Sequence, residues 1–285
     1  MIHVKLGYAC NNACLFCPYG DKRVTVGNLA ADAALAAIPA AKRKNDGAGI
    51  SLSGGETLLR RDLTELVRAA RGRGFRAIEI QTNGRMLAYR KLAHELREAG
   101  ATCALVLLLG PDAAIHDFHT RAPGSFKQTV AGIRNAVAEG IAVEVRTILT
   151  KSNYRHLGDL AAVAADLGAR RLRLAFPSGV DAKLFRTLVP RLGKLASYVT
   201  AAVELGRKLG LPVETEGLPL CHAVAPVAAG AELFAKGDPP PDGWAVKGPP
   251  CAACALASRC PGLEAAYAQT YGFGELVPLP PPSPA

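Results

Sequence analysis

Short apolar runs alternate with longer amphipathic stretches along most of the chain. The runs with β-strand character lie at 2–8, 49–55, 77–84, 104–110, 142–150 and 171–176. Between them, segments such as 62–74, 90–100, 129–140 and 156–168 carry apolar residues at three- and four-residue spacing, and most end on glycine, as helices do. This alternation predicts a parallel sheet with right-handed crossovers.

The number of strands limits the architecture. Six β-like runs are fewer than the eight strands of a closed barrel, so a partial barrel and an open doubly wound sheet are both compatible with them. A further helix is expected over 194–210. Polar and glycine-rich residues follow the strands, at the end where parallel sheets bind their ligands.

The sequence changes character near residue 215. Residues 215–277 contain many prolines and glycines, little periodicity and four of the eight cysteines. Such a segment has few ways to build its own core, so we expect a small irregular domain held by a metal. Residues 278–285 form a proline-rich tail that is expected to be extended or disordered.

The charge balance restricts the partners. The 285-residue chain has 34 Lys and Arg against 24 Asp and Glu, a formal net charge of +10. This favours anionic partners. Aromatic residues make up only 6%, and no basic run is interleaved with stacking side chains, so solvated helix faces explain the charge better than a nucleic-acid surface.

No segment predicts a membrane span or a secretory signal. The longest apolar stretch, 104–110, is too short to cross a bilayer. We therefore expect a cytoplasmic protein without a membrane partner. In that reducing compartment, eight cysteines favour metal ligands or buried thiols over disulfides.

Three cysteines directly follow the first β-like run. Cys10, Cys14 and Cys17 are spaced C-x3-C-x2-C, and no fourth cysteine or histidine lies close by to complete a structural zinc site. Three thiolates suit a metal centre with one open position, such as a four-iron cluster with one iron free.

At these residues the chain resembles the radical S-adenosylmethionine (radical SAM) enzymes. Their motif is C-x3-C-x-aromatic-C, and Phe16 occupies the aromatic position. The segment 51–57 resembles the family's G-G-E segment, although Thr57 replaces a frequent proline, and 81–84 resembles its T-N-G segment. The resemblance covers residues 2–210 and implies an α/β fold, a partial (β/α)6 TIM-like barrel over 1–214.

The resemblance also implies a set of cofactor-binding residues. A 4Fe-4S cluster is expected on Cys10, Cys14 and Cys17, with S-adenosylmethionine at its free iron. Glu56 is expected to contact the amino group of that ligand, and Arg146 its carboxylate or ribose, although a structural ion pair is nearly as good an interpretation of Arg146. The remaining expected cofactor-binding residues are Phe16, at the aromatic position of the motif, and Gly54, Gly55, Thr82 and Asn83, which offer close backbone approach or hydrogen bonds.

Two histidines and one further cysteine have simpler explanations. His116 and His119 lie in a segment, 110–126, that is expected to be a long loop, and packing explains them better than chemistry. Cys103 begins a β-like run and is expected to be buried. No catalytic side chain is assigned.

A second cysteine set lies in the C-terminal segment. Cys251, Cys254 and Cys260 have the spacing C-x2-C-x5-C and are preceded by Cys221, with His222 as an alternative ligand. Zinc or an iron-sulfur cluster would accept four thiolates. The spacing resembles a truncated SPASM or twitch extension of radical SAM enzymes, which implies a second 4Fe-4S cluster in preference to zinc.

The implied chemistry is reductive cleavage of S-adenosylmethionine to a 5′-deoxyadenosyl radical, which abstracts a substrate hydrogen. The preferred substrate is a peptide that is oxidised, epimerised or cross-linked. One alternative is dehydrogenation or rearrangement of a small metabolite, and another is a zinc-stabilised binding module. The expected partners are a reductant such as flavodoxin or ferredoxin and, because the cysteine motif begins at residue 10, a separate leader-peptide-binding protein.

Overall fold

The computed structural model describes residues 1–44, 49–180, 182–222, 243 and 245–280. Its main sheet is parallel, and its strands follow one another in chain order. The strands are β1 (Ile2–Lys5), β2 (Ile50–Ser53), β3 (Ile78–Thr82), β4 (Cys103–Leu107), β5 (Ala142–Ile148), β6 (Arg171–Ala175) and β7 (Val213–Glu216). All six expected runs form strands, and β7 is an additional one.

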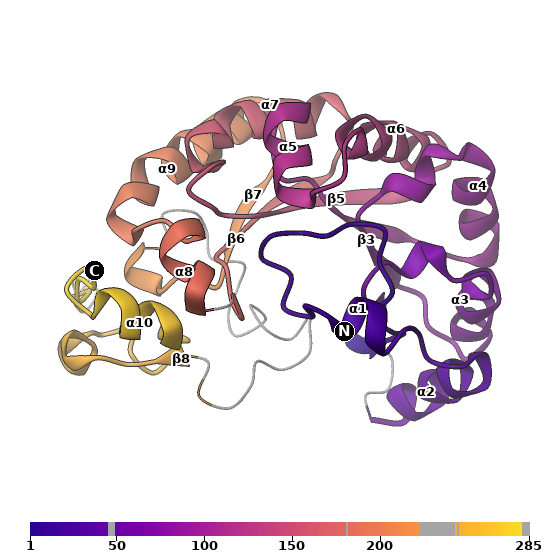
Figure 1. Ribbon diagram of the computed structural model, residues 1–285, viewed down its shortest axis with the longest axis horizontal. Helices are drawn as coiled ribbons and strands as arrows, with labels where there is room; N and C mark the ends of the chain where they lie inside the picture. Colours follow the sequence, from indigo (N-terminus) through magenta and orange to yellow (C-terminus); the bar gives the residue numbers. More distant parts are fainter. Residues whose placement is uncertain (45–48, 181, 223–242, 244, 281–285) are drawn as a thin grey trace, which may run out of the picture.

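The sheet curves into an open barrel with helices on its outer side (Figure 1). β1 and β7 are the two ends of the strand order and do not pair with each other. The helices that follow successive strands are α2 (Ala31–Lys44), α3 (Leu63–Gly72), α4 (Arg90–Ala99), α6 (Ser125–Ala138), α7 (Leu157–Asp166) and α9 (Leu192–Lys208). The expected partial TIM-like barrel is therefore confirmed, with seven strands instead of six.

The two faces of the sheet differ in polarity. The outer face, toward the helices, is apolar. Leu52, Ile80 and Ala104 pair across three strands there, as do Val106, Val145 and Leu172, and all six are buried. Because side chains alternate between faces along a strand, the intervening residues, such as Gln81, Arg146 and Arg173, lie on the inner face. The barrel interior is therefore rich in polar and charged groups.

β7 was missed because its sequence, VETE, has only one apolar residue. Val213 and Thr215 are buried on its outer side. Glu214 and Glu216 alternate with them, and each forms an ion pair with an arginine of a neighbouring strand. The expected domain boundary at 214–215 falls inside this strand.

A short helix occupies part of the segment that was expected to be a loop. α5 (Ala113–Thr120) begins after Asp112, whose side chain accepts a hydrogen bond from Ile115 N (2.9 Å). It ends at Arg121 in the left-handed conformation (φ 51°) instead of at a glycine. The lack of a terminal glycine and the short length removed the usual helix signals.

The remaining elements lie at the strand ends and in the C-terminal segment. α1 (Lys22–Thr25) follows the first cysteines, and α8 (Ala182–Leu188) precedes α9. Single turns of 3₁₀ helix are η1 (Thr57–Leu59), η2 (Arg85–Ala88), η3 (Tyr154–His156), η4 (Leu220–His222) and η6 (Pro249–Ala253). The C-terminal segment adds α10 (Ala265–Tyr271) and an antiparallel pair, β8 (Ala245–Val246) with β9 (Leu263–Glu264).

The C-terminal segment packs beside α8 and α9 (Figure 1). Tyr267 is fully buried there, with its ring against Phe176 and Phe185. Its hydroxyl accepts a hydrogen bond from Leu192 N (2.9 Å) and donates one to Glu275. This segment is therefore attached to the barrel through a buried polar group as well as aromatic contacts.

Only the first part of the proline-rich tail can be compared with its expectation. Residues 278–280 have no helix or strand, and Leu279 O accepts a hydrogen bond from Ala255 N (2.9 Å). Residues 281–285 lie outside the described residues. Among the described helices, none is long and apolar enough to cross a membrane.

Candidate active site

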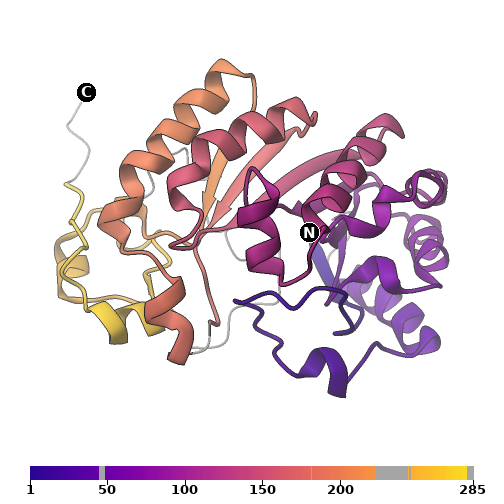
Figure 2. The same cartoon turned by 45° about the horizontal axis from the view of Figure 1, so that its top comes forward.

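The loop with the first three cysteines is fixed by the C-terminal end of α5. Ala13 N donates to Thr120 O (2.9 Å), and Leu15 N donates to His119 O (3.1 Å). Figure 2 shows this indigo loop passing beneath α5. The last carbonyl groups of a helix have no partner within it, so the loop satisfies two of them and is held in place.

Two arginines and an asparagine hold the chain between Cys10 and Cys14. Arg85 Nη1 donates to Asn11 O (2.5 Å) and to Asn12 Oδ1 (2.7 Å), and Arg23 Nη1 donates to Asn12 O (2.6 Å). Asn83 Nδ2 donates to Asn11 Oδ1 (2.7 Å). Sequence analysis missed both arginines, although Arg85 directly follows the TNG segment.

The three thiols lie near one another. All are partly buried. Burial raises the pKa of Cys10, and it raises that of Cys14 to about 12, with a further contribution from the neighbouring thiols Cys10 and Cys17. A positively charged metal centre would offset this cost, because thiolates are the form that binds metal.

The donor chemistry suits an iron-sulfur cluster. The three thiols of this loop lie close enough for the charge of one thiolate to raise the pKa of another. Asn12 N also donates a hydrogen bond to Cys10 Sγ (3.4 Å). Backbone donors to ligating sulfur are a normal part of cluster sites. Within the part of the chain that the structure describes, no three His, Cys, Asp or Glu side chains are arranged to hold a single metal ion.

Gly54 and Gly55 allow the end of β2 to pair with the cysteine loop. Gly55 N donates to Gly7 O (3.0 Å), and Glu56 N donates to Ala9 O (2.8 Å). A Cβ atom on Gly55 would lie 2.2 Å from Tyr8 O, and one on Gly54 would lie 2.7 Å from Gly7 O. These glycines are required by close backbone approach.

Glu56 connects the ends of two strands. Its carboxylate is 1% exposed and accepts hydrogen bonds from Leu58 N (3.0 Å), Thr82 Oγ1 (2.6 Å) and Asn83 N (2.6 Å). Burial outweighs these bonds and raises the pKa of Glu56. The expected contact with the amino group of a ligand stays a prediction, and the structure shows a carboxylate that fixes Thr82 and Asn83.

Six of the expected site residues surround one open cavity of about 150 Å³. Three further lining residues, Gln81, Leu105 and Leu107, were missed, although they precede or neighbour the recognised motif on inward-facing strand positions. The full lining is Cys10, Gly54, Gly55, Gln81, Thr82, Asn83, Leu105, Leu107 and Arg146. Phe16 lies outside this lining, buried with its ring centroid 6.2 Å from that of His119.

Arg146 lies at the cavity and in an ion pair at the same time, and its contact with a ligand stays a prediction. It lines the cavity, and its Nε also forms an ion pair with Glu216 Oε2 (2.9 Å). The side chain is 38% exposed, whereas its Nε is buried. The ion pair and the position at the cavity are thus compatible.

His116 and His119 pack inside the protein. His116 Nδ1 accepts a hydrogen bond from Leu109 N (3.1 Å), and burial lowers its pKa to about 4. His119 is bonded to Ile115 O (2.6 Å) and Thr150 Oγ1 (2.7 Å). Cys103 is buried, as expected, and burial raises its pKa to about 12.

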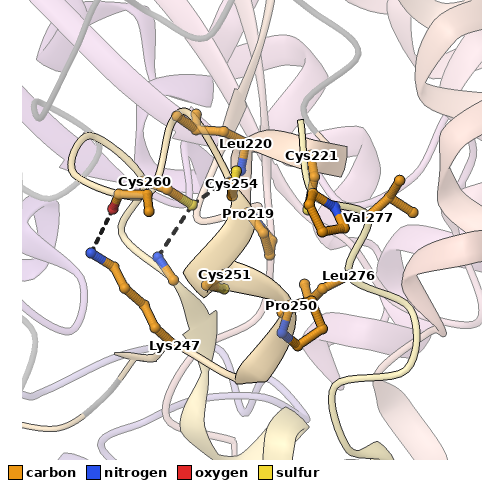
Figure 3. Close-up of a pocket in the computed structure, with 13 residues that line it drawn as sticks. Pro219, Leu220, Cys221, Lys247, Pro250, Cys251, Cys254, Cys260, Leu276 and Val277 are labelled. Carbon is orange, nitrogen blue, oxygen red and sulfur yellow. Dashed lines mark hydrogen bonds between the residues drawn. The ribbon is translucent and has the colours of Figure 1, made fainter. Parts of the chain in front are cut away.

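The four C-terminal cysteines line one small cavity of about 20 Å³ (Figure 3). Cys260 Sγ accepts hydrogen bonds from Leu220 N and Gly262 N, both at 3.4 Å. His222 does not line this cavity, and its Nε2 is bonded to Glu275 O (2.6 Å). The structure thus brings Cys221, Cys251, Cys254 and Cys260 together without His222.

Comparison with known proteins identifies the family. The model of the Radical SAM superfamily matches residues 4–164, more than half of the chain. The chain therefore belongs to the radical SAM superfamily of enzymes. Membership implies a 4Fe-4S cluster and S-adenosylmethionine.

Curated relatives match parts of the chain. A 137-residue region is 32% identical to an AdoMet-dependent heme synthase of Oleidesulfovibrio alaskensis, covering 47% of this chain and 35% of the synthase. A 179-residue region is 32% identical to a probable GTP 3′,8-cyclase of Methanopyrus kandleri, covering 62% of this chain and 57% of the cyclase. The matches therefore span at most 57% of these two relatives.

Solved structures share the fold. Streptococcus suis SuiB bound to precursor peptide SuiA has a TM-score of 0.61 at 18% identity, covering 75% of this chain and 48% of SuiB. Native anSMEcpe with bound AdoMet and Cp18Cys peptide has a TM-score of 0.58 at 14% identity, covering 74% of this chain and 62% of that one.

Proposed function

We propose that this protein cleaves S-adenosylmethionine reductively at the cavity beside Cys10 and abstracts a hydrogen atom from a peptide substrate, which it oxidises, epimerises or cross-links. The observation that carries the proposal is the convergence of the cysteine loop with Gly54, Gly55, Thr82, Asn83 and Arg146 around one cavity. Segments far apart in the sequence supply these residues. Motifs that matched the family only by chance would not be expected to lie around one cavity.

Cys10, Cys14 and Cys17 would hold the cluster. When bound, it supplies the electron that divides S-adenosylmethionine into methionine and a 5′-deoxyadenosyl radical. The protein positions the reactants: the backbone at Gly54 and Gly55 admits the ligand closely, and Thr82 and Asn83 form a polar wall fixed by Glu56. Leu105 and Leu107, on the adjacent strand β4, give the cavity an apolar part that limits water.

Arg146 would bind the carboxylate of S-adenosylmethionine. Guanidinium groups bind carboxylates through paired N–H donors. The Nε of Arg146 faces Glu216, so its outer end can serve the cavity. Phe16 would support the cysteine loop from behind, since it is buried against His119.

The peptide assignment is supported by the fold neighbours and by charge. SuiB and anSMEcpe are both described with bound peptides. The chain's net charge of +10 favours an acidic partner. The second candidate is dehydrogenation or rearrangement of a small metabolite, which the names of the curated relatives favour, since a heme synthase and a GTP cyclase act on small molecules.

The C-terminal segment would form an auxiliary unit around a second 4Fe-4S cluster. Four cysteines line one cavity, and two backbone N–H groups point at Cys260 Sγ. We expect the Cys10/Cys14/Cys17→Ala variant to retain about four irons per chain after anaerobic reconstitution. Zinc in place of iron would make the segment a structural clip.

A reductant such as flavodoxin or ferredoxin would deliver electrons, and a separate protein would present a leader peptide.

The substrate class can be tested by incubating the reduced, reconstituted enzyme with deuterated acidic peptides and deuterated metabolites. We expect deuterium in 5′-deoxyadenosine with a peptide. Transfer from a metabolite and from no peptide would replace the first candidate with the second.

A further inference from the structure

A line of alternating charges crosses the inner face of the barrel. Arg170 Nη2 contacts Glu144 Oε1 (2.6 Å), and the other oxygen of Glu144 contacts Arg173 Nη2. Arg173 Nη1 contacts Glu216 Oε1 (3.1 Å), and Glu216 Oε2 contacts Arg146 Nε (2.9 Å). We call these five side chains the charge ladder.

The middle of the charge ladder is buried. Glu144 is 2% exposed and Arg173 is 4% exposed. Burial opposes the charge on Glu144, but Arg173 and Arg170 outweigh it, and its pKa lies below the ordinary value. The two carboxylates are shared among three guanidinium groups, so one positive charge is in excess.

Arg146 is the end of the charge ladder that reaches the cavity. Glu216 forms ion pairs with both Arg146 and buried Arg173. The Nε of Arg146 is buried and makes no hydrogen bond within the described part of the chain, so the charge of Glu216, 2.9 Å away, holds this edge of the guanidinium. Among the described residues, no hydrogen bond engages its Nη atoms. A guanidinium held by its Nε presents its two terminal nitrogens side by side, which is the arrangement that binds a carboxylate.

We infer that Glu216 is a positioning residue that directs Arg146 into the cavity for the carboxylate of S-adenosylmethionine. This inference rests on the proposed function. It gives β7 a role in ligand binding although none of its residues lines the cavity. Buried Arg173 opposes movement of Glu216 toward the ligand, since that movement would remove one of the two carboxylates that neutralise its guanidinium.

A neighbouring ion pair supplies a matched control. Arg171 Nη1 contacts Glu214 Oε1 (3.0 Å), which joins the same two strands, β6 and β7, two residues earlier than Glu216. This pair does not line the cavity and is outside the charge ladder. Glu214→Gln therefore removes a similar ion pair without affecting Arg146.

The test is the equilibrium dissociation constant of S-adenosylmethionine for the anaerobically reconstituted full chain, with iron content and thermal unfolding measured on each sample. Glu216→Gln should weaken binding about tenfold, the loss expected for one charge-assisted contact. Glu216→Asp should restore part of it. Glu214→Gln should bind like the wild type, and Arg146→Lys with Glu216→Gln should bind no more weakly than Arg146→Lys alone.

Equal affinities of Glu216→Gln and Glu214→Gln would overturn the inference, as would an Arg146→Lys variant that binds like the wild type. A loss of affinity in Glu216→Gln that is matched by loss of iron, with no rescue by Asp, would also overturn it in favour of a structural role. Failure of the proposed function would show separately, as a wild type that binds the ligand but forms no 5′-deoxyadenosine.

Discussion

The shape of the cavity depends on residues that lack a side chain. Gly55 lies where a Cβ atom would approach backbone oxygens of Tyr8 and Ala9 at 2.2 and 2.4 Å. Backbone atoms cannot move aside as a flexible side chain would. The contact between β2 and the cysteine loop is therefore sensitive to a single added carbon.

We expect Gly55→Ala to lower the free energy of unfolding by about 1–3 kcal/mol, the usual cost of overpacking. The apparent unfolding midpoint should fall by about 5 °C, with reduced iron retention. Gly72→Ala in α3 is the control, because nothing lies within 4 Å of its added carbon. Equal midpoints for the two variants would contradict the role of Gly55.

Sequence motifs identified the residues whose spacing carries information. Cys10, Gly55 and Asn83 belong to short segments with a fixed order, and the structure brings them to one cavity. Leu105 and Leu107 have no such signal, because inward and outward leucines of a strand look alike until the barrel curves. Arg23 and Arg85 were missed because their partners are backbone and asparagine oxygens of a distant loop.

At the scale of elements, α5 connects the cysteine loop to the barrel. Its terminal carbonyls hold the loop, and its two histidines are buried between the helix and the strand ends. His116 is packed as a neutral ring, because burial lowers its pKa to about 4. Its neutral form thus contributes to stability at neutral pH.

That contribution should be lost as the pH falls from about 6.5 toward 4, because the unfolded chain takes up a proton that the folded ring resists. At pH 5 the loss in free energy of unfolding amounts to about 2 kcal/mol. His116→Asn should therefore show a smaller fall in apparent unfolding midpoint between pH 7.5 and 5 than the wild type, measured by differential scanning calorimetry. Parallel pH profiles would refute this explanation.

α5 and β7 are two of the elements that the sequence did not predict. Both are short, and their polar residues make tertiary contacts: the histidines of α5 pack inward, and the glutamates of β7 pair with arginines. Local periodicity reports which face is apolar, but it cannot show that a charged position is neutralised by another strand. The longer amphipathic helices had no such ambiguity.

At the scale of the whole molecule, polar contacts of Glu275 attach the C-terminal segment to the barrel. Glu275 accepts hydrogen bonds from Tyr267 and from Gly193 N (3.1 Å) and pairs with Arg191 Nε (2.8 Å), which joins the chain after α10 to the start of α9. Proline content and cysteine spacing predicted an irregular unit, but could not predict which barrel surface it contacts.

Tyr267→Phe should loosen this attachment by about 1–2 kcal/mol, because it leaves Leu192 N and Glu275 without their partner. Hydrogen-deuterium exchange should be faster in α10 and in the first turn of α9. Tyr271→Phe is a matched control, since its ring packs on the same cluster. Unchanged exchange in both variants would argue that ring packing alone holds the segment.

The most direct measurement is the 5′-deoxyadenosine formed per chain by the reduced, reconstituted enzyme. We expect at least one equivalent for the wild type and none for Cys10/Cys14/Cys17→Ala, whereas Cys251/Cys254/Cys260→Ala should retain cleavage. Wild-type enzyme with a full cluster and no product, or undiminished product from the first variant, would contradict the assignment of the cavity beside Cys10 as the site of cleavage.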